Sequence, residues 1–392
     1  MSIDSIVLLL PPIGQYGVIK YFTRQLMAAF ERQGVHCNLV CETEDSHEFF
    51  KEIFNASPDC TLSFNGLLPD EKGTFFCDLI QIPHVACLVD SPTHFMGLAG
   101  SPYTIITCVD RDFSETFRLI KPGQVLFMPH ATDKDLYAKP EAERKFDVVM
   151  FSSCINPEKI KNSWKDKFIP NLVRVIEKAA EITLSERDTP FLEAFSKVLV
   201  DLHNNTEKMD LEALNYESIL DELESYICGI DRIELLKAIP KEITVHVYGA
   251  GKNEASWKEI FPDEDSNIKI HDSIPVEEAF EIMKQSKVVL NSSPSIKNGA
   301  HERIFNGIAC GALVLTNDNP YIRKEFKDGE EILLFHSNHW KECMPGLLEV
   351  LKDDSKRCQM VNKAYEKVKH NHTWDVRAKM LLESLPQILE KL

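Results

Sequence analysis

The chain has 392 residues, enough for two ordinary domains, and 44% of them are hydrophobic, as in a globular protein. The net charge of −17 excludes broad, non-specific binding to nucleic acid or to an anionic membrane. No stretch approaches the ~20 apolar residues of a transmembrane helix. The eleven cysteines, mostly inside apolar runs, favour reduced thiols and a cytoplasmic location.

The first third of the chain alternates strands with loops and helices. Ser5 to Leu10 predicts a buried strand, a loop with Gly14 and Gly17 follows, and an amphipathic helix ends at Gly34. Such an alternation is typical of a Rossmann-like unit, although the full G-x-G-x-x-G is missing and the loop also reads as a plain tight turn. The further predicted strands are Val35 to Cys41, Cys60 to Phe64, Val85 to Leu88, Thr104 to Cys108 and Val125 to Met128.

Polar side chains follow the strand that ends at Leu88. The segment C-L-V-D-S-P-T-H-F places Asp90 and His94 at the carboxyl end of this strand, where open parallel sheets bind ligands. Both residues are therefore candidates for chemistry, and the alternative for His94 is an ordinary surface or capping histidine.

A D-x-D pair follows the strand that ends at Cys108. Asp110 and Asp112 could share one divalent cation, because carboxylate oxygens are ligands that Mg²⁺ and Ca²⁺ prefer. The alternative, which the pattern favours, is that they begin and cap the helix from Phe113 to Leu119.

The second half opens with a strand, Lys145 to Ser153, and continues with a long helical stretch at about 157–239. Gly229 is predicted to end a helix within this stretch. This stretch is longer than a usual link between two strands, so it predicts a helical insertion in a second domain.

A glycine turn follows the next strand, Ile243 to Tyr248. Gly249 and Gly251 would let the backbone approach a diphosphate, and Lys252 could neutralise it, although a glycine turn alone is a weak signal. The strand Asn267 to His271 then leads through a short turn into a helix.

The most informative stretch begins after the strand Lys287 to Leu290. A polar loop, Asn291 to Gly299, precedes a helix expected from Ala300 to Cys310, and Gly311 should end this helix in the left-handed conformation. Ala312 to Thr316 predicts the next buried strand. A strand thus delivers a loop onto a helix N-terminus, which together with Lys297 and Arg303 favours a phosphate-bearing ligand.

The run H-E-R-I-F-N-G-I-A-C-G-A-L-V-L-T and the later D-G-E-E-I-L-L-F resemble the donor-site region of GT-B glycosyltransferases, in the branch related to the spore-maturation protein CgeB. The tail H-N-H-T-W-D-V-R-A-K-M-L-L is similar to the end of CgeB-like proteins. Asn306 stands where this branch usually carries a glutamate for the nucleotide ribose, and Asn298 where the wider group places its first glutamate. Asparagine keeps hydrogen bonding to a hydroxyl but brings no charge.

The resemblance implies an α/β fold of two Rossmann-like domains facing a cleft. Residues 1–140 would form the acceptor domain, and residues 141–370 the nucleotide-sugar domain with its helical insertion. Residues 371–392 would form a helix that crosses back to the first domain. The implied activity is transfer of a sugar from a UDP- or GDP-linked donor to a glycan, lipid-linked glycan or protein, with retention and without a metal or other cofactor.

The resemblance also implies roles for individual residues. Asp90 and His94 would orient the acceptor hydroxyl or remove its proton. The donor residues would be Lys252, Lys297 and Arg303 at the diphosphate, Gly249 and Gly251 close to it, Asn298 and Gly299 near the sugar and phosphate, Asn306 at the ribose, and Ser273 and Ile274 at the base. The cleft-facing loops would include Gly14, Gly17 and His130.

Two alternatives remain open from the sequence. One is a metal-dependent transferase that uses Asp110 and Asp112. The other is a non-catalytic relative that binds a nucleotide sugar or a partner, which the uncharged Asn298 and Asn306 suggest.

Overall fold

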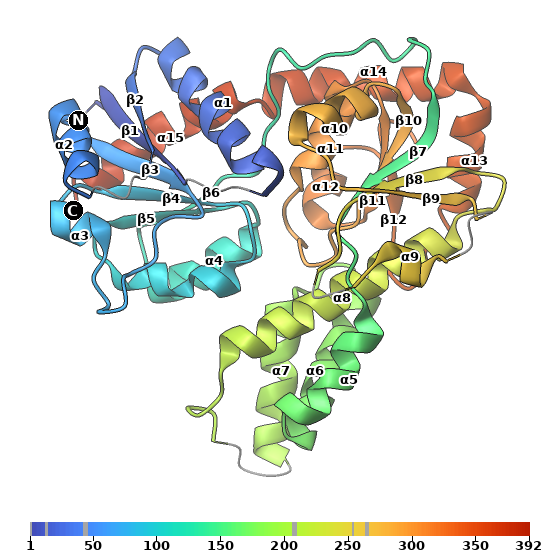
Figure 1. Ribbon diagram of the computed structural model, residues 1–392, viewed down its shortest axis with the longest axis horizontal. Coiled ribbons are helices and arrows are strands. Elements are labelled where there is room, and N and C mark those ends of the chain that lie inside the picture. Colours follow the sequence, from blue (N-terminus) through green and yellow to red (C-terminus); the bar gives the residue numbers. More distant parts are fainter. Residues whose placement is uncertain (1, 12–14, 42–45, 206–209, 253–254, 263–265) are drawn as a thin grey trace. The chain divides into compact units, whose positions relative to one another are not determined.

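The computed structural model describes residues 2–11, 15–41, 46–205, 210–252, 255–262 and 266–392 (Figure 1). The chain divides into two compact units. Unit 1 comprises residues 1–136, 300–306 and 367–392, and unit 2 comprises residues 137–299 and 307–366. Each unit is an α/β structure around one six-stranded parallel sheet. Among the described residues, no helix has both the length and the apolar character needed to cross a membrane.

The sheet of unit 1 has the strand order β2-β1-β3-β4-β5-β6. Its strands β3, β4 and β5 are wholly buried, as expected for a parallel sheet with helices on both faces. The strands are β1 (Ser5–Leu10), β2 (His36–Cys41), β3 (Cys60–Phe64), β4 (His84–Leu88), β5 (Thr104–Cys108) and β6 (Val125–Phe127). The sequence predicted all six, and β1, β3 and β5 have the predicted limits.

Two cores bracket this sheet. On one face, Phe22 and Phe30 of α1 pack with Trp374 and Leu381 of the last helix, α15. The other face is a smaller core that includes Ile53 of α2 and Ile80 of α3. The helices of unit 1 are α1 (Val18–Arg32), α2 (Ser46–Ala56), α3 (Phe76–Ile80), α4 (Arg111–Ile120) and α15 (Trp374–Leu389).

The sheet of unit 2 has the strand order β12-β11-β10-β7-β8-β9. Its core packs the C-terminal half of α8, together with α13 and α14, against one face of the sheet. The strands are β7 (Phe146–Phe151), β8 (Val245–Tyr248), β9 (Ile268–His271), β10 (Ser286–Leu290), β11 (Leu313–Asn317) and β12 (Leu333–Phe335). Two helices, α11 (Glu302–Ala309) and α14 (Asp354–Asn371), begin in the residues of one unit and end in those of the other. The remaining helices are α9 (Trp257–Ile260), α10 (Val276–Met283), α12 (Pro320–Glu325) and α13 (Met344–Lys352).

The predicted helical insertion lies between β7 and β8 as four helices that pack on one another (Figure 1). They are α5 (Pro157–Lys167), α6 (Pro170–Ser185), α7 (Phe191–Asn205) and α8 (Tyr216–Ala238). The prediction that Gly229 stops a helix was wrong, because α8 continues through it for nine more residues. A side chain at Gly229 would lie 2.9 Å from the carbonyl oxygen of Ile155, so this glycine lets α8 approach the segment after β7.

Candidate functional site

The strand order of unit 2 reverses between β7 and β10. The chain runs outward from β7 to β8 and β9, and then returns to the other side of β7 for β10, β11 and β12. Open parallel sheets bind ligands beyond the carboxyl ends of their strands at such a switch point. One loop begins there at Ser152, after β7, and another at Asn291, after β10. The glycine turn follows the neighbouring strand, β8.

A buried carboxylate, Asp231 of α8, ties together the carboxyl ends of three strands. It accepts hydrogen bonds from Ser292 after β10 (2.7 Å), Asn317 at the end of β11 (2.9 Å) and Ser337 after β12 (2.7 Å). A fourth bond comes from the indole Nε1 of Trp340 at 2.7 Å. Asp231 is 0% exposed, so these four donors compensate for the removal of its charge from water.

The glycine turn after β8 packs against the chain itself. A side chain on Gly249 would collide with the carbonyl of Ser152, and one on Gly251 with the carbonyl of Ala255. Both glycines are thus required by the close approach of backbone to backbone. Lys252 reaches back to α8, where its ammonium donates to the Ser225 hydroxyl at 3.0 Å.

Lys297, in the loop after β10, is 6% exposed. Its ammonium donates to the carbonyl oxygens of Thr183 (2.6 Å) and Glu186 (2.9 Å) at the end of α6, where the helix dipole favours a cation. Burial lowers the pKa of Lys297 to about 8, although the carboxylate of Asp231 partly offsets this effect. The side chain also lines a small cavity beside Arg187.

The rest of the loop after β10 is held by Asn319, the N-cap residue of α12. Its amide donates to the carbonyl oxygens of Ile296 and Gly299, each at 3.1 Å. Gly299 is buried and Asn298 is half-buried at the end of this loop. The residues predicted to meet the base, Ser273 and Ile274, are half-buried in the turn between β9 and α10.

Unit 1 has its own switch point, between β1 and β3. Asn65 follows β3 with a φ of 62°, and its amide donates to the Asp90 carboxylate at 2.7 Å. The amide oxygen of Asn65 accepts from the backbone of Val89 at 3.0 Å. Asp90 is therefore an exposed carboxylate with a fixed orientation at this edge of the sheet. His94 is exposed in the short helix that follows, Pro92–Gly100.

A cluster of ionisable groups lies elsewhere in unit 1. His301 forms a short ion pair with Glu302, Arg303 lies 3.9 Å from the same carboxylate, and His130 Nε2 lies 3.9 Å from it. Burial by itself would raise the pKa of Glu302, but His301 and Arg303 hold it well below its usual range. Burial lowers the pKa of His130 to about 4, so this imidazole is neutral at physiological pH.

The position of His130 is fixed by Arg377 of α15. The guanidinium donates to the carbonyl oxygens of Pro129 (2.7 Å) and His130 (2.8 Å). His130 is 3% exposed, and its Nδ1 has no hydrogen-bond partner among the described residues. The imidazole is thus neutral and closely held, and one of its ring nitrogens is still available for a hydrogen bond.

The remaining residues predicted from the sequence belong to α11 and to the segment before α1. Asn306 is 2% exposed on α11, and its amide oxygen has no partner among the described residues. Arg303 and Asn306 belong to the α11 residues of unit 1, whereas Lys297 belongs to unit 2. Gly17 adopts a φ of 74° where α1 begins, and Gly14 lies outside the described residues.

The D-x-D pair forms a helix cap. The Asp110 carboxylate accepts from the backbone N–H groups of Asp112 (2.7 Å) and Phe113 (3.3 Å) at the start of α4. Asp110 is 0% exposed, so its side chain faces into the protein. The capping role that the sequence favoured is confirmed.

Comparison with known proteins relates the chain to glycosyltransferases. Residues 232–383 match the family model described as "Glycosyl transferase-like". The chain is also similar in structure to HepE of Anabaena in complex with UDP and glucose, with 12% identity, a TM-score of 0.57 and coverage of 98% of this chain and 100% of that one. The chain has the GT-B fold, and residues 232–383 match a glycosyltransferase-like family model.

Two further structures support the GT-B fold. Sucrose-phosphate synthase of Thermosynechococcus elongatus has 11% identity and a TM-score of 0.57 over 99% of this chain and 100% of that one. AviGT4, a glycosyltransferase involved in avilamycin A biosynthesis, has 10% identity and a TM-score of 0.58 over 99% of each chain. These likenesses concern the fold alone. No curated protein matches the sequence.

Sequence reasoning missed three residues that the structure makes prominent. Asn65 follows a predicted strand and precedes a glycine, which is a signal for a left-handed turn at a sheet edge. Glu302 stands between His301 and Arg303, and this grouping alone suggests an ion-pair cluster. Asp231 carries no local signal, because its four partners come from distant parts of the sequence.

Proposed function

We propose that this glycosyltransferase belongs to the CgeB-like branch and transfers a sugar from a UDP- or GDP-linked donor to a glycan, lipid-linked glycan or protein. The observation that carries the proposal is the position of the family match. Residues 232–383 include the segments that follow β8, β10 and β11, at the edge of a parallel sheet where ligands bind. The eleven unpaired thiols support a cytoplasmic location.

In this proposal, residues 141–370 form the donor domain. Gly249 and Gly251 bring backbone near the diphosphate, and Lys252 contributes charge. Lys297 uses two of its three N–H donors for the end of α6, which leaves one for a phosphate oxygen. The other donor contacts come from Asn298 and Gly299 near the sugar and phosphate, from Ser273 and Ile274 at the base, and from Arg303 and Asn306 on α11.

The acceptor side is proposed to lie in the domain of residues 1–140. The last helix, residues 371–392, packs against this domain. Asp90 is the acceptor-side carboxylate: it is exposed, and Asn65 fixes its direction. His94 is the second candidate for contact with the acceptor hydroxyl. His130 is neutral and donates or accepts a single hydrogen bond, which suits a sugar hydroxyl.

The reaction is proposed to proceed with retention and without a metal. The departing nucleoside diphosphate carries the developing negative charge, and basic side chains with a helix N-terminus can stabilise it. Arg303, in the first turn of α11, would take this role. Because Glu302 lies beside it, the arginine is pre-oriented, although part of its charge is offset.

The proposal is tested by thermal shift of the full chain against a panel of nucleotide sugars, each with and without a chelator. UDP-glucose comes first, because the similar HepE structure contains UDP and glucose. We expect a rise in Tm with one donor that survives the chelator and is lost in Arg303→Ala. Arg118→Ala, which removes an exposed arginine of α4, is the matched control and should retain the shift.

Two outcomes would favour other functions. A shift that needs a divalent metal would point to a metal-dependent transferase, although the use of Asp110 as a helix cap argues against its service as a ligand. Donor binding without any turnover would point to a non-catalytic relative, in which Asn298 and Asn306 replace the charged residues of the family.

A further inference from the structure

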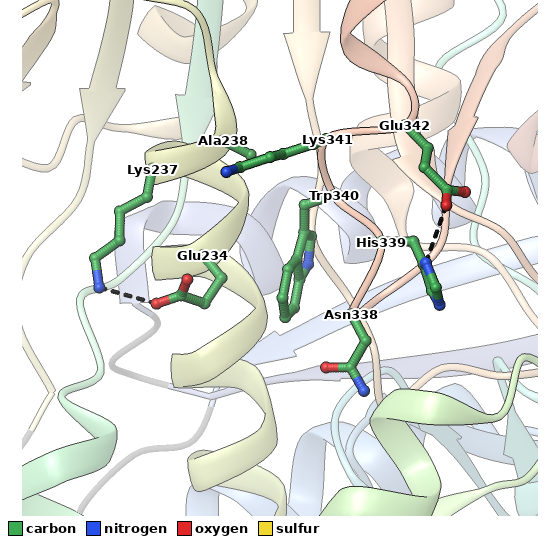
Figure 2. Close-up of a pocket in the computed structure, with 8 residues that line it drawn as sticks. All are labelled: Glu234, Lys237, Ala238, Asn338, His339, Trp340, Lys341 and Glu342. Carbon is green, nitrogen blue, oxygen red and sulfur yellow. Dashed lines mark hydrogen bonds and ion pairs between the residues drawn. The ribbon is translucent and has the colours of Figure 1, made fainter.

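A pocket of unit 2 lies beyond the end of the edge strand β12 (Figure 2). The last turns of α8 form one wall with Glu234 and Lys237, and the loop Asn338–Glu342 forms the other. Its volume is about 470 Å³, within the range of pockets that bind small molecules. None of the residues assigned to the donor lines it, so it is a separate site.

The centre of this pocket is the indole of Trp340 (Figure 2). Its Nε1 donates to Asp231 at 2.7 Å, and Asp231 is itself held by three further hydrogen bonds. The orientation of the ring is therefore fixed before any ligand arrives. The other three tryptophans, Trp164, Trp257 and Trp374, are at most 2% exposed, whereas Trp340 is only partly buried.

Polar groups surround the indole and are also held in place. Asn338 is exposed with a φ of 68°, in the left-handed region that asparagine enters more readily than most residues. The Glu234 carboxylate is oriented by Lys237 at 2.9 Å, and His339 by Glu342 at 3.0 Å. An aromatic face with amide and carboxylate groups beside it offers both apolar contact and hydrogen bonds.

The charges of the lining balance. Glu234 and Glu342 are acidic, and Lys237 and Lys341 are basic, so the pocket has no formal excess of either sign. A nucleoside diphosphate or another anion would gain no net attraction here. The lining instead suits a neutral ligand that has one apolar face and several hydroxyl groups.

We infer that this pocket binds a neutral carbohydrate. The C–H face of a pyranose ring packs on the indole of Trp340, and its hydroxyl groups bond the Asn338 amide and the Glu234 carboxylate. The site lies outside the donor-binding loops. The inference does not depend on the proposed transfer reaction, because it rests on the pocket alone.

The test measures binding of neutral oligosaccharides to the full chain. The probes are hexasaccharides built from glucose, galactose, mannose and N-acetylglucosamine, followed by tryptophan fluorescence and by isothermal titration calorimetry. Because Trp340 is the accessible tryptophan, sugar binding should change the emission of the wild-type chain. We expect Trp340→Ala to abolish this change and to weaken binding at least 50-fold.

A second variant keeps the test decisive if Trp340→Ala disturbs folding. Asn338→Gly takes the same backbone conformation without strain and removes only the amide, so it should fold normally and bind at least fivefold more weakly. Tyr216→Ala, at the opposite end of α8, is the control and should bind like the wild type. The inference is overturned if no probe binds, if binding is unchanged in both pocket variants, or if free UDP competes for the same pocket.

Discussion

Replacement of Asp231 by asparagine should destabilise unit 2 strongly, although the two side chains have nearly the same shape. The carboxylate accepts four hydrogen bonds, from Ser292, Asn317, Ser337 and Trp340. An amide has one accepting oxygen, and its nitrogen can only donate. The two donors that face the Oδ2 position, Ser292 and Asn317, would therefore meet an N–H group.

The size of the effect follows from these partners. The Ser292 hydroxyl can rotate and accept from the new amide, but the Asn317 amide nitrogen loses one of its two acceptors and keeps only the Ser337 hydroxyl at 3.3 Å. One buried donor without a partner costs about 1–3 kcal/mol. Each of the two bonds kept by the remaining oxygen changes from a charged to a neutral acceptor and loses roughly 1 kcal/mol. We therefore expect Asp231→Asn to lower the free energy of unfolding by about 3–5 kcal/mol.

The assay is urea unfolding followed by far-UV circular dichroism, because tryptophan emission would report on Trp340 itself. Asp221→Asn is the matched control on the same helix: it weakens a surface contact with Lys252 at 3.3 Å and should change stability by less than about 1 kcal/mol. Equal effects of the two substitutions would refute the reasoning, since the Asp231 network would then contribute no more than a surface ion pair.

Three further predictions concern single positions. Gly311→Ala should lower the free energy of unfolding by roughly 3 kcal/mol or more, because its Cβ would collide with a backbone oxygen and a guanidinium nitrogen. Gly329→Ala, with a similar φ and open space around it, should lower it by only about 1 kcal/mol. Urea unfolding compares the two variants. Burial lowers the pKa of Lys297 from 10.5 to about 8, so the unfolded chain alone holds this proton between those pH values. The free energy of unfolding of the wild type should therefore rise relative to Lys297→Met from pH 8 to 10.5, and a constant difference would contradict this. Asp110→Ala should lower the stability of the protein by about 1–2 kcal/mol, because it removes the helix cap. Asp112→Ala should lower it by less than half as much. Thermal unfolding measures both, and equal losses would argue against the cap.

Much of the fold follows from local patterns in the sequence. Strands such as Cys60–Phe64 are short apolar runs bounded by polar residues, and in a parallel sheet that is buried on both faces such runs have few alternatives. Gly311 behaves as expected, with a φ of 75° after α11. Asp110 likewise caps α4, since a carboxylate just before a helix finds free N–H groups within reach.

The parts that the sequence did not predict depend on contacts between distant segments. Gly229 resembles a helix stop, but the neighbouring backbone at Ile155 requires a glycine inside a continuous helix. Lys297 reads as a phosphate ligand, yet two of its donors serve the end of α6, which is more than a hundred residues earlier. The Asp231 network likewise gives no local signal in the sequence, because the partners of Asp231 are 61 to 109 residues away from it along the chain.

The central claim, that the chain transfers sugar from a nucleotide donor, is tested most directly by release of the nucleoside diphosphate. The full chain is incubated with each nucleotide sugar of the panel in the presence of a chelator, with water or an added oligosaccharide as the acceptor of the sugar, and free UDP or GDP is measured. We predict release from one donor, reduced on the order of 100-fold in Asp90→Asn, because an acceptor-side carboxylate assists the proton transfer. A donor that binds but is never cleaved, with or without added metal, would contradict the claim.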